Sequence, residues 1–117
     1  MYSNVDCGYN YYGVICKGGN NRFSNCSFSG NCIGVYLDCK NEPNNAHGIF
    51  VGCEIVHSFG TLEDARILNP SADIGNSASK YCGKGIICDG VSTSEIFDSC
   101  QIGYGKIDII DSNSIKF

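Results

Sequence analysis

Three segments of the sequence share the pattern Phe-x-x-Cys-x-Phe/Ile: FSNCSF at residues 23–28, FVGCEI at residues 50–55 and FDSCQI at residues 97–102. A second pattern, Gly-Val/Ile-x-Cys/Leu, precedes each of them, as GVIC at residues 13–16, GVYL at residues 34–37 and GIIC at residues 85–88. Two motifs that recur three times in the same order indicate a repeated structural unit.

The spacing of the motifs gives the length of this unit. Gly13 and Gly34 are 21 positions apart, so one repeat takes about 20 residues. The next glycine of this series, Gly85, is 51 positions beyond Gly34, and the excess is rich in polar residues, Gly and Asn. Such segments are typical of loops that leave a repeat without changing its register. We therefore expect one domain over residues 1–117 with loop insertions at about 40–47 and 58–84.

Side chains alternate within each motif as they do in short β-strands. Successive side chains of a strand point to opposite faces, which places Val14 and Cys16 inward and Ile15 outward. The chain holds 20 isoleucines and valines against three leucines, and β-branched residues favour strands. A bend near Asn25 separates Phe23 from Phe28. The prediction is an all-β fold of about four stacked coils, each with three short strands, whose equivalent residues lie about 4.8 Å apart.

The nine cysteines follow the repeat. Their number is odd, and the sequence contains no Cys-x-x-Cys motif, so a zinc site is not indicated. A disulfide framework is the alternative for a small secreted domain. Free cysteine behaves as a small buried hydrophobe, and we interpret the repeated cysteines as core residues.

These motifs resemble the right-handed parallel β-helices of the pectate-lyase-like superfamily. The resemblance is carried by the Gly-Val-x-Cys strands and by Asn25-Cys26-x-Phe28, with weaker versions at Gly52-Cys53 and Ser99-Cys100. It covers most of the chain and implies a right-handed parallel β-helix, a single-stranded solenoid with a long loop insertion. The superfamily includes polysaccharide lyases and hydrolases, surface adhesins and bacteriophage tailspikes.

Charge and hydropathy exclude several functions. The net charge is −4 and no run of basic residues is present, whereas nucleic-acid binding needs clustered Lys and Arg. No apolar stretch approaches the length of a membrane span, and the N-terminus lacks signal-peptide features. No metal-binding or cofactor-binding motif is evident, so we expect neither a metal nor a cofactor.

The candidate functional residues are polar and aromatic. Aligning the repeats places Lys17, Asp38 and Asp89 in one outward column, and a retaining glycosidase uses two carboxyl groups about 5–5.5 Å apart. The alternative is a salt-linked surface column without catalysis. Aromatic rings and a polar loop are typical of sugar-binding surfaces, and the expected substrate-binding residues are Tyr36, Lys17, Glu63, Asp64, Arg66 and Tyr81.

Three functions remain open. The first is a phage tailspike or tail-fibre component, assembled in the host cytoplasm into the virion tail, that binds host surface polysaccharide. The second is a polysaccharide hydrolase or lyase, and the third is a bacterial adhesin at the cell surface. An outward apolar column of Ile15, Tyr36 and Ile87 is expected to be covered by the 58–84 loop or to meet a second chain; the resemblance to tailspikes favours a homotrimer interface.

Overall fold

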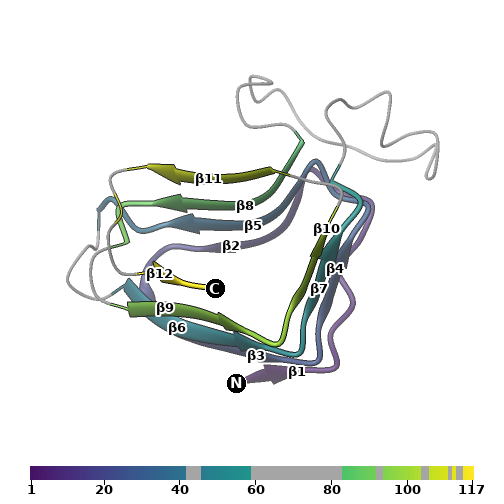
Figure 1. Ribbon diagram of the computed structural model, residues 1–117, viewed down its shortest axis with the longest axis horizontal. Helices are drawn as coiled ribbons and strands as arrows, with labels where there is room; N and C mark the ends of the chain where they lie inside the picture. The colour runs from purple at the N-terminus through teal and green to yellow at the C-terminus, as the bar shows by residue number, and fades with distance from the viewer. Residues whose placement is uncertain (42–45, 59–82, 92–93, 104–105, 111, 113–114) are drawn as a thin grey trace.

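The chain is built of β-strands. The computed structural model describes residues 1–41, 46–58, 83–91, 94–103, 106–110, 112 and 115–117 (Figure 1), and no helix occurs among them. The all-β prediction is therefore confirmed. The predicted loop insertion at 40–47 lies partly outside the described residues, and that at 58–84 lies almost entirely outside them.

The strands form three parallel sheets. Sheet A has the order β1 (Tyr2–Ser3), β3 (Gly19–Ser24), β6 (Ala46–Val51), β9 (Ser94–Asp98) and β12 (Ile115–Lys116). Sheet B has the order β4 (Ser27–Ser29), β7 (Glu54–Val56) and β10 (Gln101–Gly103), and sheet C has the order β2 (Tyr12–Cys16), β5 (Ile33–Asp38), β8 (Lys84–Asp89) and β11 (Lys106–Ile110). From β2 onward the strands fall in sheets C, A and B in turn, so every third strand returns to the same sheet. Figure 1 shows the three sheets facing a common interior.

The register of sheet C agrees with the motif alignment. Val14 pairs with Val35 and Val35 pairs with Ile86, although the last two residues are 51 positions apart. Cys16, Leu37 and Cys88 form the neighbouring inward column of the same strands. All of these residues belong to or pack against one buried cluster. The predicted inward faces of these strands are confirmed.

The outer face of sheet C carries the apolar column that the motif alignment predicted. Ile15, Tyr36 and Ile87 do lie in one column, and Ile15 is 42% exposed, but Tyr36 is only 7% exposed and Ile87 is fully buried. Tyr36 and Ile87 belong to a second apolar cluster with Tyr11, Cys32 and Ile33. The side chains of Tyr36 and Ile87 are therefore covered within this chain and are not available to a second chain. The 58–84 loop, which was one of the two expected covers of this column, lies almost entirely outside the described residues.

A ladder of stacked rings crosses the interior. Neighbouring ring centroids are 5.0, 4.8, 4.7 and 5.3 Å apart along the series Tyr2, Phe23, Phe50, Phe97 and Phe117. Parallel in-register pairing produces this ladder because it places the same motif position of each repeat on neighbouring strands. Each ring therefore covers the face of the next one and excludes water from it.

The eight cysteines that the structure describes are thiols. None of these eight forms a disulfide, and six of them are buried. Cys53 donates its Sγ–H to the Phe23 carbonyl oxygen at 3.7 Å, and Cys100 donates to the Phe50 carbonyl oxygen at 3.4 Å. Each thiol thus reaches back to the preceding repeat. The interpretation of the cysteines as core residues is confirmed, and the disulfide framework is wrong for the eight described here.

The bend predicted at Asn25 is a left-handed residue. Asn25 has a φ of 53°, and the equivalent residues Asn4, Gly52 and Ser99 have φ values of 57°, 61° and 55°. Asn and Gly adopt this conformation more readily than other residues do. The turn leads from sheet A into sheet B at the same place in each repeat, so the strands of both sheets stay in register.

Candidate functional site

Asp38 and Asp89 lie side by side at the ends of β5 and β8. They are register partners in sheet C, as the motif alignment predicted. One ammonium group joins them: Lys40 Nζ donates a short hydrogen bond to Asp38 Oδ1 and lies 3.8 Å from Asp89 Oδ2. The aspartate side chains are 19% and 11% exposed and the lysine side chain is 49% exposed. We call these three residues the acidic pair cluster.

The chain after β5 positions Lys40. The Cys39 amide donates to the Asp89 carbonyl oxygen at 2.8 Å, while the Cys39 side chain is buried in the core. Gly90, with a φ of 77°, lets the backbone of Lys40 pass close to the end of β8. Any side chain at this position would clash, because its Cβ would lie 2.6 Å from the Lys40 Cα. The hydrogen bond to Asp38 raises the pKa of Lys40. Lys40 is therefore charged at neutral pH and compensates the two carboxylates.

This geometry limits what the acidic pair cluster can do chemically. Lys40 Nζ is hydrogen-bonded to an oxygen of Asp38 and lies close to an oxygen of Asp89. In a glycosidase these carboxyl oxygens would instead face the glycosidic bond. Lys40 also lies 5.9 Å above the Tyr36 ring, whose small exposed fraction leaves little area for a sugar. Lys17 is exposed just beyond β2 and belongs to none of the described ion pairs.

The other predicted substrate-binding residues cannot be placed. Glu63, Asp64, Arg66 and Tyr81 fall in the segment 59–82, outside the described residues. The structure therefore brings together Asp38, Asp89 and Tyr36 from the predicted set and adds Lys40 to them. Lys40 was missed because the sequence alignment considered only strand positions, and it follows the strand by two residues.

A second polar surface lies on the outer face of sheet A. A hollow of about 220 Å³ is lined by Asn20, Arg22, His47, Gly48, Ile49 and Ser94. We call it the sheet A hollow. Asn20 pairs with His47 and His47 pairs with Ser94 in the parallel register. Their side chains therefore form a row across three strands, with Arg22 and Ile49 in the next row.

The polar groups of the sheet A hollow are available to a ligand. Arg22 joins none of the ion pairs among the described residues, and the side chains of Asn20, His47 and Ser94 form no hydrogen bond within that part of the chain. Amide, imidazole, hydroxyl and guanidinium groups together offer both donors and acceptors. The hollow can therefore hydrogen-bond a polyhydroxylated ligand, and Arg22 can additionally bind an anionic group.

Sequence reasoning missed the sheet A hollow because its residues share no residue type. A usable signal exists, since Asn20, His47 and Ser94 each stand three residues before the Phe of the repeated motif. Because side chains alternate along a strand, a residue three positions before an inward Phe points outward. The row could have been found by aligning positions, although not by searching for similar residues.

The comparisons with known proteins leave the family open. No family model matches this chain, and no curated protein or solved structure is detectably similar to it. Among the described residues, no group of three or more potential metal ligands comes together. The same part of the chain contains no helix long and apolar enough to cross a membrane.

Proposed function

We propose that this chain is a segment of a right-handed parallel β-helix from a phage tailspike or tail fibre that binds host surface polysaccharide. The in-register return of every third strand supports the fold, since a solenoid stacks equivalent strands in this way. Free thiols in the core suit assembly in a reducing cytoplasm before incorporation in the virion. The family assignment rests on the motif resemblance, and the binding function on the surface of the sheets.

The sheet A hollow is the observation that carries the binding function. Sugars present hydroxyl groups along their length, and three hydrogen-bonding side chains on successive strands provide a row of partners at the strand spacing of about 4.8 Å. Rigid parallel strands hold this row in place. Binding therefore costs the conformational entropy of the side chains but little of the backbone. Ile49 supplies an apolar contact beside them.

A binding screen tests this function. The purified chain is passed over immobilised capsular and lipopolysaccharide glycans from candidate hosts, and retention is measured together with the release of reducing ends. We expect one glycan class to be retained by the wild type, with weaker retention by His47→Ala and Arg22→Gln. Lys84→Gln is the matched control, because Lys84 lies on β8 in sheet C, pairs with Asp108 at 3.0 Å and does not line the hollow. Retention that is equal in all four proteins would place binding elsewhere.

A polysaccharide-degrading enzyme is the second candidate, and the side-by-side position of Asp38 and Asp89 favours it. Hydrolysis would require Lys40 to move from Asp38, freeing a carboxyl group to act as general acid. Asp38→Asn and Asp89→Asn should then each abolish release of reducing ends while retention persists. Release that is unchanged in both variants would remove this candidate.

We also propose that the functional unit is a homotrimer, as tailspikes of this fold commonly are. Ile15 on the outer face of β2 remains exposed and is available to a neighbouring chain. Light scattering at high protein concentration should give three times the chain mass, and Ile15→Lys should reduce it. A monomer under these conditions would contradict the trimer.

A further inference from the structure

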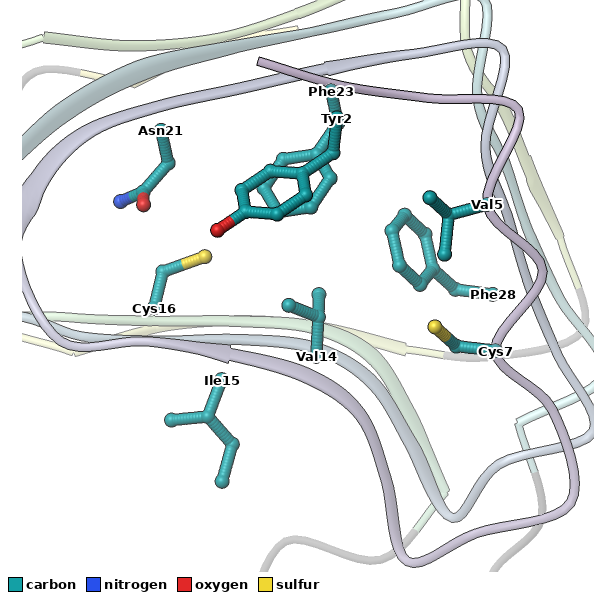
Figure 2. A pocket seen from close by; sticks show the side chains of 9 residues that line it. All are labelled: Tyr2, Val5, Cys7, Val14, Ile15, Cys16, Asn21, Phe23 and Phe28. Atoms are coloured by element: carbon teal, nitrogen blue, oxygen red, sulfur yellow. The ribbon is translucent and has the colours of Figure 1, made fainter.

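The outward side chains of sheet A form rows that cross the strands. Figure 2 shows Asn21 and Phe23 of β3 pointing into the space between the sheets, so Asn20 and Arg22 point outward by strand alternation. Both of these outward residues are exposed. The parallel register repeats their two positions on β6 and β9.

The row that begins at Arg22 has a cation at each end and two apolar residues between them. Arg22 pairs with Ile49, and Ile49 pairs with Ile96. Lys116 of β12, which is exposed, is the next member of this row. Three strand spacings of about 4.8 Å place the Cα atoms of Arg22 and Lys116 about 14 Å apart.

The two cations of this row are not compensated within the described part of the chain. Arg22 and Lys116 belong to none of the ion pairs found there. The carboxylates on the described strands of sheet A are Glu95, which is buried in the core, and Asp98, which lies two residues beyond Ile96 on β9. The row therefore carries positive charge, although the net charge of the chain is −4.

Each part of the row selects a different feature of a ligand. The Arg22 guanidinium is planar and can donate two parallel hydrogen bonds to one carboxylate. A charged group placed over Ile49 and Ile96 would lose hydration without gaining a partner, so the part of the ligand that lies there is uncharged. The C–H face of a neutral sugar meets this requirement. The adjacent polar row of the sheet A hollow can hydrogen-bond the hydroxyl groups of the same sugar.

We propose that the ligand of the sheet A hollow is an acidic polysaccharide whose charged sugars are separated by neutral ones, and that it lies across the strands. One carboxylate binds Arg22, and the next approaches Lys116. The neutral sugars between them pass over Ile49 and Ile96. A polysaccharide with an acid on every sugar would place carboxylates over the two isoleucines and bind less tightly. This inference rests on the proposed function, because it names the class of polysaccharide that the same site binds.

The experiment compares pairs of glycans that differ in charge alone. Capsular polysaccharides with short linear repeats and one uronic acid per repeat are immobilised beside the same polysaccharides after chemical reduction of their carboxyl groups. Polygalacturonate, which carries an acid on every sugar, and neutral dextran complete the panel. We expect the wild type to bind an acidic member at least about tenfold more tightly than its reduced form, and more tightly than polygalacturonate.

Variants of the two cations test how the charge is recognised. Arg22→Gln should lower the affinity for the acidic member at least about tenfold and leave that for the reduced form nearly unchanged, so that the two forms become almost equal. Arg22→Lys keeps the charge but loses the paired hydrogen bonds, and its affinity should fall between those of Arg22→Gln and the wild type. Lys116→Gln should weaken binding of the acidic form by about two- to fivefold, as expected for an exposed ion pair.

Asn20→Ala is the matched control in the polar row, because Asn20 is exposed and uncharged. It should weaken binding of both forms of a glycan by the same factor. Equal binding of acidic and reduced forms by the wild type, or an equal loss of both in Arg22→Gln, overturns this inference and leaves the proposed function standing. Tighter binding of polygalacturonate than of every glycan with spaced acids also overturns it. A wild type that binds no glycan, in this panel or in the wider screen, removes the proposed function and this inference together.

Discussion

Glu95 is a buried acid whose replacement should change the pH dependence of stability. Its side chain points into the core from β9, is 1% exposed, and its Oε1 has no hydrogen-bond partner among the described residues. Gly48 on the neighbouring strand makes room for it, because a Cβ there would lie 2.8 Å from that oxygen. The thiols of Cys16, Cys39 and Cys88 are nearby titratable groups. Burial raises the pKa of Glu95 from 4.5 to about 7.

The free energy follows from this pKa. A tenfold change in an ionisation equilibrium corresponds to about 1.4 kcal/mol, so ionised Glu95 costs the folded state about 3 kcal/mol relative to the unfolded chain. Below pH 4.5 the Glu95 carboxyl is protonated in both the folded and the unfolded chain, so no stability is lost. Between pH 4.5 and about 7 the unfolded chain binds fewer protons, so stability falls as pH rises, and above that window the loss is complete.

The assay is urea unfolding from about pH 4 to about pH 8 under reducing conditions, followed by tyrosine fluorescence because the chain has no tryptophan. Glu95→Gln removes the charge with little change of shape. The difference in unfolding free energy between variant and wild type should grow by about 3 kcal/mol from the acid to the alkaline limit. Any constant cost of burying the amide cancels in this comparison.

Glu54→Gln is the matched control, since it makes the same chemical change at an exposed position on β7, and the pH-dependent gain of Glu95→Gln is measured against it. The reasoning fails if Glu95→Gln and the wild type show the same pH dependence. It also fails if the difference grows toward acid pH, because that sign would mean that the carboxylate is stabilised in the folded state.

Three further results are expected from the core. Phe50→Ala removes the central ring of the ladder and should lower the free energy of unfolding by about 3–5 kcal/mol; a loss below about 1 kcal/mol would mean that the rings contribute little. Burial raises the pKa of Cys16 and Cys88 to about 12, so a thiol reagent near neutral pH should label them only after denaturant is added, and reducing agent should leave the unfolding midpoint unchanged. Gly52→Ala should cost more than about 1 kcal/mol because its φ is 61° and a Cβ would lie 2.8 Å from Asn25 Oδ1; equal stability would show that the turn is not strained by a side chain.

The inward positions could be predicted from the sequence because the fold repeats them. Phe23, Phe50 and Phe97 recur at one motif position, and in-register strands require similar volumes at equivalent places. The same alignment placed Asp38 beside Asp89 across an insertion. It could not decide whether Tyr36 and Ile87 would be covered within this chain or by a second one, since burial of the outer face of sheet C depends on packing beyond the repeated motifs.

The sheet A hollow shows the limit of motif reasoning at the outer surface. Asn20, His47 and Ser94 occupy equivalent positions but have no residue type in common, because neighbouring strands do not have to fill the same volume where solvent is present. What they share is their place in the repeat, three residues before the inward Phe. This can be recognised only once the column of inward Phe residues is known. Lys40 lies outside the strands, so no position count would have found it.

Parallel in-register stacking also explains why an ionic cluster is weaker evidence of catalysis here than in other folds. Equivalent positions lie next to each other, so a charge that recurs in the motif meets its own copy on the next strand, and like charges directly opposite are destabilising. Asp38 beside Asp89 is such a pair, and Lys40 compensates it. The side-by-side position of the two carboxylates therefore follows from the fold alone. Arg22 has no such compensating partner among the described residues, which makes the sheet A hollow the stronger candidate for a surface that binds a ligand.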